Sequence, residues 1–169
     1  AAADQLGPWR ATFHAFGFSK HLWLDSDSGK SYQSDASFPL DIDDLESEWQ
    51  RSTPSICVLN QMLDIGEIEL KCATGIGNPG ASALTTPGYQ PMVGLEISTN
   101  GGRTWGRQRF MSLGREGEYL RVRWQANGSG RDVAFRFTGS DPVVGLALIE
   151  LYVEMGDERG RQVDLGQAA

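Results

Sequence analysis

The chain has 169 residues, of which 40% are hydrophobic and 22% are charged. This balance is typical of one globular domain, and a chain of this length can fold without disulfide bonds or structural metal ions. No apolar run approaches the roughly 20 residues that a membrane-spanning helix requires, so we expect no membrane partner. The net charge of −7 arises in residues 1–85, where 5 Lys and Arg face 12 Asp and Glu, whereas residues 86–169 carry 10 of each sign, and every cation there is arginine.

Strands dominate the first 74 residues. The only segment with helical character is 41–50, which is acidic and could equally be a loop that leads into a strand at 47–52. We treat 1–74 as a strand-rich portion of the same β domain as the rest of the chain. The candidate strands, read from period-two alternation, are 9–18, 20–24, 47–52, 55–59 and 67–74.

Residues 75–91 are mostly Gly, Pro, Ala, Ser and Thr, and they predict a long loop. A second, five-strand antiparallel portion follows over 92–155, and residues 156–169 have no periodicity and predict a flexible tail. Short strands separated by turns at this spacing are typical of a sandwich or a barrel. We therefore predict an all-β fold, an antiparallel β-sandwich or barrel-like domain with long loops. Its five strands are 92–98, 104–113, 118–126, 132–139 and 143–155.

The sequence contains no recognisable catalytic or metal-binding signature. Cys57 and Cys72 have no metal-ligand spacing, and we expect both to be reduced and buried, with a disulfide as the alternative. The only histidines, His14 and His21, lie near no recognisable nucleophile motif. The segment 25–32 resembles a calcium loop loosely, but its position twelve is an alanine, so we interpret it as a turn. We expect no enzyme activity, no metal and no cofactor.

Two rows of arginines alternate with other residues on predicted strands. Side chains two apart on a strand face the same way, so Arg107 and Arg109 form one row, and Arg121 and Arg123 form another. The rows could be cross-strand neighbours and could contact a phosphate backbone. We favour ion pairs with the acid-rich first half, within or between subunits. The acidic candidates, which are also candidate subunit contacts, are Asp41, Asp43, Asp44, Glu46 and Glu48.

The stretch EISTNGGRTW, residues 96–105, predicts a hairpin tip. The Asn-Gly-Gly run accepts positive φ, which favours the tight turns that join antiparallel strands. The spacing resembles the Asp-box hairpin of sialidase-like propellers, with Asn100 in place of the usual Asp; there the box is a structural turn. We expect the Asn100 side-chain oxygen to cap amides of the turn and Trp105 to pack beneath it. The predicted turn residues are Ser98, Asn100, Gly101, Gly102, Thr104 and Trp105.

The order of motifs from this hairpin onward resembles the C-terminal part of the packaged-DNA stabilisation proteins of short-tailed phages, the tail hub factors that plug the portal. That family's pattern is an Asp-box-like hairpin, a Gly-x-x-Gly-x-Tyr turn, an Arg-x-x-Trp strand, an aromatic strand and a Ser-Asp-Pro turn. The match is good over about 92–150 and weak over 9–70. The matching residues are Ser98, Gly101, Gly102, Thr104, Trp105, Gly114, Gly117, Tyr119, Arg121, Trp124, Arg131, Phe135, Ser140, Asp141 and Pro142.

The resemblance implies a non-enzymatic virion protein, made in the host cytoplasm and assembled as a homo-oligomeric ring at the head-to-tail junction. Its partners would be portal, adaptor and other tail proteins, with packaged DNA contacted, if at all, without sequence specificity. Family members are usually several times longer, so we expect a truncated relative or a fragment. Two other functions stay open, a carbohydrate-binding sialidase-like module and a DNA-binding domain that uses the arginine rows.

Overall fold

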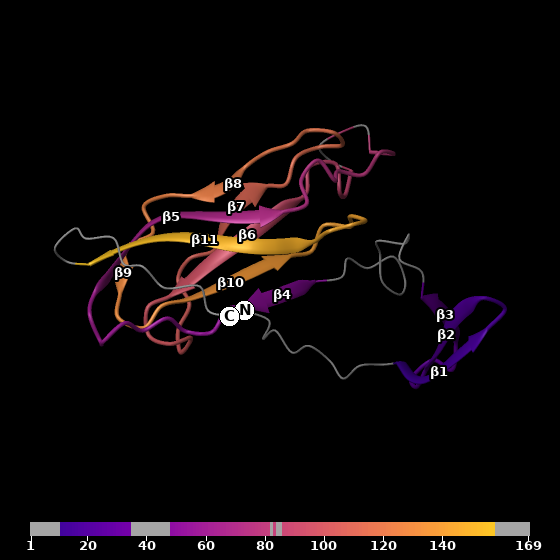
Figure 1. The fold of residues 1–169 in the computed structure, drawn as a ribbon. Coiled ribbons are helices and arrows are strands. Elements are labelled where there is room, and N and C mark those ends of the chain that lie inside the picture. Colours follow the sequence, from indigo (N-terminus) through magenta and orange to yellow (C-terminus); the bar gives the residue numbers. More distant parts are fainter. Residues whose placement is uncertain (1–10, 35–47, 82, 84–85, 158–169) are drawn as a thin grey trace. The chain divides into compact units, whose positions relative to one another are not determined.

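The computed structural model describes residues 11–34, 48–81, 83 and 86–157, and every regular element in them is a β-strand (Figure 1). The fold class predicted from the sequence, all-β and antiparallel, is confirmed. Contacts divide the chain into two compact units, Ala1–Leu45 and Glu46–Ala169. The strands between 46 and 74 belong to unit 2, because they pair with strands of the C-terminal half.

Unit 1 holds one antiparallel sheet of three strands in the order β1-β2-β3. Its strands are β1 (Ala11–Gly17), β2 (Lys20–Asp25) and β3 (Ser31–Ser34). The first turn consists of Phe18 and Ser19, which both have positive φ (55° and 59°). The second turn is organised by Asp25, which is 2% exposed and accepts a hydrogen bond from the backbone N–H of Asp27 at 3.0 Å.

Unit 2 is built from two antiparallel sheets. The first has the strand order β4-β10-β6-β7, and the second has the order β11-β5-β8, with β9 also pairing with β5. The bounds are β4 (Trp49–Ser52), β5 (Leu63–Cys72), β6 (Met92–Ser98), β7 (Arg109–Ser112), β8 (Val122–Trp124), β9 (Ser129–Gly130), β10 (Ala134–Gly139) and β11 (Leu148–Asp157).

One continuous core fills the space between these two sheets. The sheets contribute alternate apolar side chains from β5, β6, β8, β10 and β11, as expected for a sandwich. On β5 the inward residues are Leu63 and Ile65, then Ile68 and Leu70, so the alternation slips by one residue. A register irregularity between β5 and β11 at the same place accounts for the slip. It leaves Glu67, Glu69 and Lys71 on the outer face of β5.

Several strands are shorter than the sequence predicted. Residues 55–59 form no strand; Ile56 makes an isolated bridge to Val133, and the chain then turns at Leu59 and Asn60, which have positive φ. Residues 104–108 belong to the exit of the hairpin turn, and 143–147 form a loop, so β7 and β11 begin later than expected. The two-residue strand β9 lies between the predicted strands 118–126 and 132–139, where we expected no strand. Residues 41–47 and 158–169 lie outside the described residues.

Candidate functional site

The turn after β6 is closed by its own side chains. Ser98, which is 1% exposed, accepts hydrogen bonds at Oγ from the backbone N–H groups of Gly102 (2.8 Å) and Asn100 (3.4 Å). Asn100 Oδ1 accepts from the backbone N–H of Thr104 at 2.9 Å, and Asn100 Nδ2 donates to Thr104 Oγ1 at 2.8 Å. The asparagine amide therefore supplies both an acceptor and a donor inside the turn, whereas an ionised aspartate would supply acceptors only.

The same turn is also bonded to β10, the strand next to β6 in the sheet, and to the residues just before β10. Gly101 N–H donates to the backbone oxygen of Asp132 at 2.9 Å. The guanidinium of Arg136, on β10, lies 4.3 Å from the centroid of the Trp105 ring and donates from Nε to Glu96 Oε2 at 2.8 Å. Trp105 thus packs against an arginine that is itself ion-paired. These contacts hold the turn against the sheet, so we interpret this arrangement as architectural.

The second arginine row forms ion pairs on the outer face of the β11-β5-β8 sheet. Arg121 contacts Glu69 through two nitrogens, with Nε at 2.9 Å from Oε1, and Arg123 lies 3.5 Å from Glu67 Oε1. The hydrogen bond and charge of Arg121 lower the pKa of Glu69 below its ordinary value. Among the described residues, their partners are thus on the neighbouring strand β5. Of the acidic residues in the segment 41–48, Asp41, Asp43, Asp44 and Glu46 lie outside the described residues, and Glu48 is exposed.

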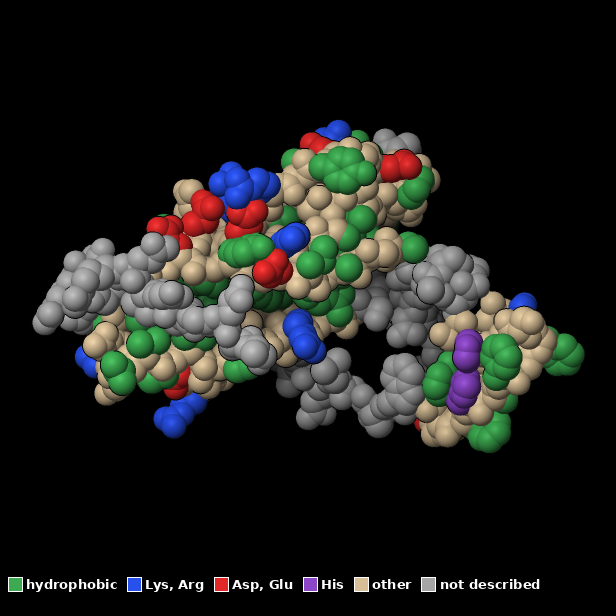
Figure 2. All heavy atoms as spheres, viewed as in Figure 1, with side chains coloured by type: hydrophobic (Ala, Val, Ile, Leu, Met, Phe, Trp, Pro, Cys, Tyr) green, Lys and Arg blue, Asp and Glu red, His purple; other side chains and the backbone are tan. Residues whose placement is uncertain are grey.

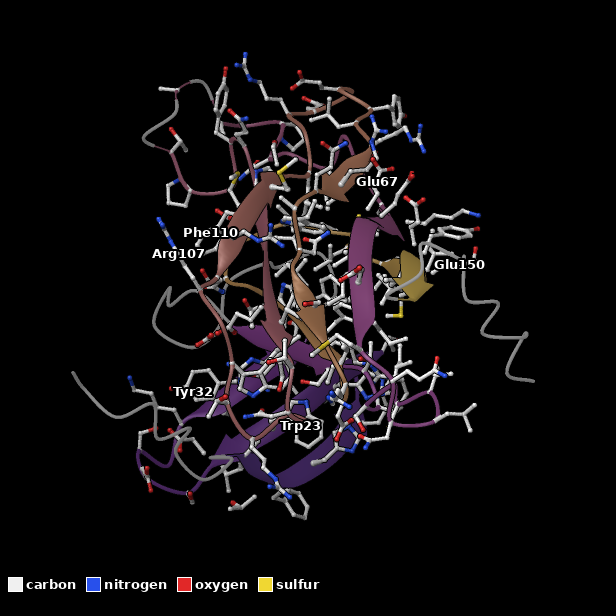
Figure 3. The ribbon with its side chains drawn as sticks, turned by 90° about the vertical axis from the view of Figure 1, so that its left-hand side faces the viewer. Trp23, Tyr32, Glu67, Arg107, Phe110 and Glu150 are labelled. Carbon is white, nitrogen blue, oxygen red and sulfur yellow. The ribbon has the colours of Figure 1, made fainter. Side chains whose placement is uncertain are left out.

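The two arginine rows do not lie on one sheet face, since β7 and β8 belong to different sheets. Arg109, on β7, connects the two sheets at the end of β8. It donates from NH1 to the backbone oxygen of Gln125 at 2.9 Å, and its own backbone oxygen accepts from Trp124 Nε1 at 3.1 Å. Arg107 is exposed. Figure 3 shows Arg107 on the side of β7, away from Glu67 on β5. Four arginines on one sheet face, the arrangement that a DNA-binding row would need, are not present.

Two turns hold the base of the long loop 75–91. Gly75 donates to the backbone oxygen of Leu113 at 2.7 Å and accepts from Gly117 N–H at 3.0 Å. At the loop's other end, the Asp141 carboxylate accepts from Met92 N–H at 2.7 Å. These contacts come from the Gly-x-x-Gly-x-Tyr and Ser-Asp-Pro turns, which are two of the motifs that carry the resemblance. The long loop 75–91 is therefore anchored by two segments that carry the resemblance.

The cysteines differ from our expectation. Both are free, but Cys57 is exposed and Cys72 is half-buried, so the prediction that both are buried was wrong. Burial raises the pKa of the Cys72 thiol to about 11. Within the described residues, no group of three or more His, Cys, Asp or Glu side chains could hold a metal ion. The described part of the chain also contains no helix with the length and apolarity needed to cross a membrane.

Sequence reasoning missed the residues that complete these arrangements. The ion-pair partners Glu67 and Glu69 could be found only with the register of β5 against β8, and Arg136 was not singled out. It also missed a set of exposed aromatic side chains, because no sequence pattern marks them as exposed. The most exposed are Phe18 (95%), Tyr119 (83%), Phe16 (65%) and Phe13 (63%).

Comparison with known proteins yields one family. No curated protein matches the chain. The model of the family described as bacteriophage P22 Gp10, beta-sandwich, matches residues 48–156, a range that begins one residue before β4 and ends within β11. The matched range includes both sheets of unit 2, the closed turn and the anchored loop. The chain therefore belongs to the bacteriophage P22 Gp10 β-sandwich family, and it is a structural protein of the phage virion.

Proposed function

We propose that this chain is part of a tail hub or connector at the phage head-to-tail junction, where it closes the portal channel and retains the packaged DNA. The observation that carries the proposal is the family match over 48–156, together with the order of motifs around the turn at 98–105. The working form would be a homo-oligomeric ring that contacts portal or adaptor proteins. Its role would be structural and not enzymatic.

The charges of unit 2 suit a protein that lies beside DNA without binding the DNA tightly. Arg121 and Arg123 are satisfied by carboxylates of their own sheet, so they offer little to a phosphate backbone. The net charge of the whole chain, −7, adds long-range repulsion of a polyanion. A duct of this kind would let DNA pass without adhering.

The contacts with neighbouring subunits and tail proteins are proposed to lie in three segments: the loop 75–91, the acidic segment 41–48 and the tail from Gly156. The loop is the part that can be argued from geometry. Its base is fixed by backbone hydrogen bonds to Leu113 and Gly117, while Pro79, Gly80 and Ala83 are exposed. A loop held firmly at its base and exposed beyond it can bind a partner at a small cost in conformational entropy.

Neither alternative function gains support from the described residues. A carbohydrate-binding module of the kind that we weighed would use tryptophan platforms, but none of the four tryptophans in the described residues is exposed. The exposed aromatic side chains are phenylalanines and tyrosines, and Phe13, Phe16 and Phe18 lie in unit 1, outside the sandwich. A DNA-binding domain needs free cations on one face, and of the two arginine rows only Arg107 is exposed without an ion pair among the described residues.

The proposal is tested by cosedimentation of the chain with an assembled portal and adaptor. Ala83→Glu places a charge on the exposed part of the loop. It should lower the affinity measured by cosedimentation at least about tenfold, because binding would bury this charge without a partner, at a cost of several kcal/mol. Gln61→Glu, which adds the same charge at an exposed turn outside the three segments, should cosediment like the unchanged chain. Equal behaviour of the two variants would count against the loop as a contact, and absence of binding by the unchanged chain would count against the connector role.

A further inference from the structure

The described residues of unit 1 contain no hydrophobic core. Every member of the core cluster among the described residues lies in unit 2, and the only buried residue between 11 and 34 is Asp25, in the second turn. Phe13, Phe16 and Phe18 are instead 63%, 65% and 95% exposed. A small antiparallel sheet becomes stable when an apolar face of it packs against another layer. The sheet of unit 1 therefore needs a layer that its own described residues do not supply.

Both faces of this sheet carry apolar side chains. Cross-strand partners share a face and successive residues of a strand alternate between faces, so the register of β1, β2 and β3 assigns each side chain. One face, the histidine face, carries His14, Phe16, His21, Trp23, Tyr32 and Ser34. The other, the leucine face, carries Phe13, Ala15, Leu22, Leu24, Ser31 and Gln33. An antiparallel sheet that faces water normally has one polar face, whereas aromatic or aliphatic side chains form the larger part of both faces here.

The apolar area exposed on unit 1 is large. Phe13, Phe16 and Phe18 alone expose roughly 300–500 Å², since an aromatic side chain offers about 150–250 Å². Figure 2 shows hydrophobic side chains beside the two histidines at the surface of unit 1. The largest apolar patch on a typical whole monomer covers about 300–600 Å², and a stable interface covers about 800 Å² of each partner. Three side chains thus supply a large part of the area that an interface needs.

The charge of this unit permits contact between identical copies. Residues 11–34 carry two lysines and two aspartates, so this segment is neutral, although the whole chain has a net charge of −7. The charge that makes copies of the chain repel one another at long range therefore lies outside residues 11–34. Two copies of this sheet can approach each other without that repulsion acting between the sheets themselves.

We propose that the sheet of unit 1 is a contact between copies of the chain, in which the histidine face of one copy packs against the leucine face of the next. A contact between identical faces would cover only one face of each sheet. A head-to-tail contact covers both faces of every copy once it closes into a ring, with neighbouring sheets about 10 Å apart, as in other stacked sheets. The inference rests on the proposed function in one respect, that the chain assembles as a ring, and it names the element that joins the subunits.

The test is the mass of the whole chain in solution, by light scattering, for two variants that each damage one face. Phe13→Lys places a charge on the leucine face, and Phe16→Lys places the same charge on the histidine face. Both positions are exposed, so both variants should fold, which circular dichroism checks. Each variant alone should need at least about tenfold more protein to assemble than the unchanged chain, because the contact would bury an unpaired charge. Leu59→Lys, at an 87% exposed position of unit 2, is the matched control and should assemble like the unchanged chain.

A mixture of the two variants decides the arrangement of the faces. Phe13→Lys keeps an intact histidine face and Phe16→Lys keeps an intact leucine face, so equal amounts of both should form particles of two chains and nothing larger. If either variant alone assembles like the unchanged chain, the proposal is overturned, while the ring of the proposed function stands through another contact.

An unchanged chain that stays a monomer would overturn the proposal as well. If the two variants then bound a portal–adaptor assembly more weakly than Leu59→Lys does, the sheet would be assigned to a different tail protein instead. The connector role is tested separately by cosedimentation. A chain that assembles through unit 1 but does not cosediment with portal and adaptor would refute the connector role and leave this contact in place.

Discussion

Replacing Gly114 by alanine should destabilise unit 2 much more than replacing Gly117, although both glycines lie in the turn between β7 and β8. Both have positive φ, 85° and 74°. A Cβ atom on Gly114 would fall on the backbone oxygen of Glu118 and lie 3.3 Å from the backbone nitrogen of Gly75, and neither atom belongs to a flexible side chain. A Cβ atom on Gly117 would meet nothing within 4 Å.

The magnitudes follow from these two situations. An alanine in the left-handed region costs about 1–2 kcal/mol, and this is the whole expected loss for Gly117→Ala. Gly114→Ala adds the displacement of packed backbone, which typically costs about 1–3 kcal/mol more. Its total loss of about 2–5 kcal/mol is a large part of the 5–15 kcal/mol that stabilises a typical domain.

Urea denaturation of both variants and of the unchanged chain, followed by tryptophan fluorescence, measures the two losses. Because the Gly114 turn holds the base of the loop 75–91, limited proteolysis should also cut this loop faster in Gly114→Ala than in Gly117→Ala. Equal losses of stability in the two variants would refute the reasoning, since backbone crowding would then contribute nothing beyond the strain of a positive φ.

Three further predictions concern other parts of the sandwich. Ser98→Ala should lower the free energy of unfolding by about 1–3 kcal/mol, because it removes the acceptor for two turn amides; thermal unfolding measures this, and an unchanged melting temperature would contradict it. The lowered pKa of Glu69 means that its ionised form stabilises the fold at neutral pH, and this contribution is lost on acidification below the ordinary pKa of 4.5. Arg121→Ala should therefore make the free energy of unfolding fall less steeply below pH 4.5. At pH 8 a thiol reagent should modify Cys57 well before Cys72, whose pKa is raised to about 11 by burial; mass spectrometry of the labelled peptides would show the order, and equal rates would contradict it.

Patterns that are local in the sequence predicted the fold and the turn. The period-two alternation over 92–98 and 132–139 corresponds to β6 and β10. The Asn-Gly-Gly run corresponds to two glycines with positive φ, 70° and 84°. Both features depend on side chains within a few residues of each other, so they can be read without knowing the rest of the chain.

Features that depend on pairing between distant segments could not be read in this way. The ion pair of Arg121 with Glu69 joins residues that are 52 apart in the chain. Its partner is set by the register of β8 on β5, which places Arg123 opposite Glu69 and Val122 opposite Leu70. The His14–His21 contact was equally hidden, since it requires the positive φ of Phe18 and Ser19 to form a two-residue turn with no glycine in it.

The measurement that tests the central claim most directly is the mass of the particle in solution, by light scattering, first alone and then mixed with a portal–adaptor assembly. A connector should form a ring of several 18.5 kDa chains, either by itself or when the adaptor is added. A chain that keeps the mass of a monomer in both conditions, while remaining folded, would contradict the connector role and direct the search to glycan and DNA titrations.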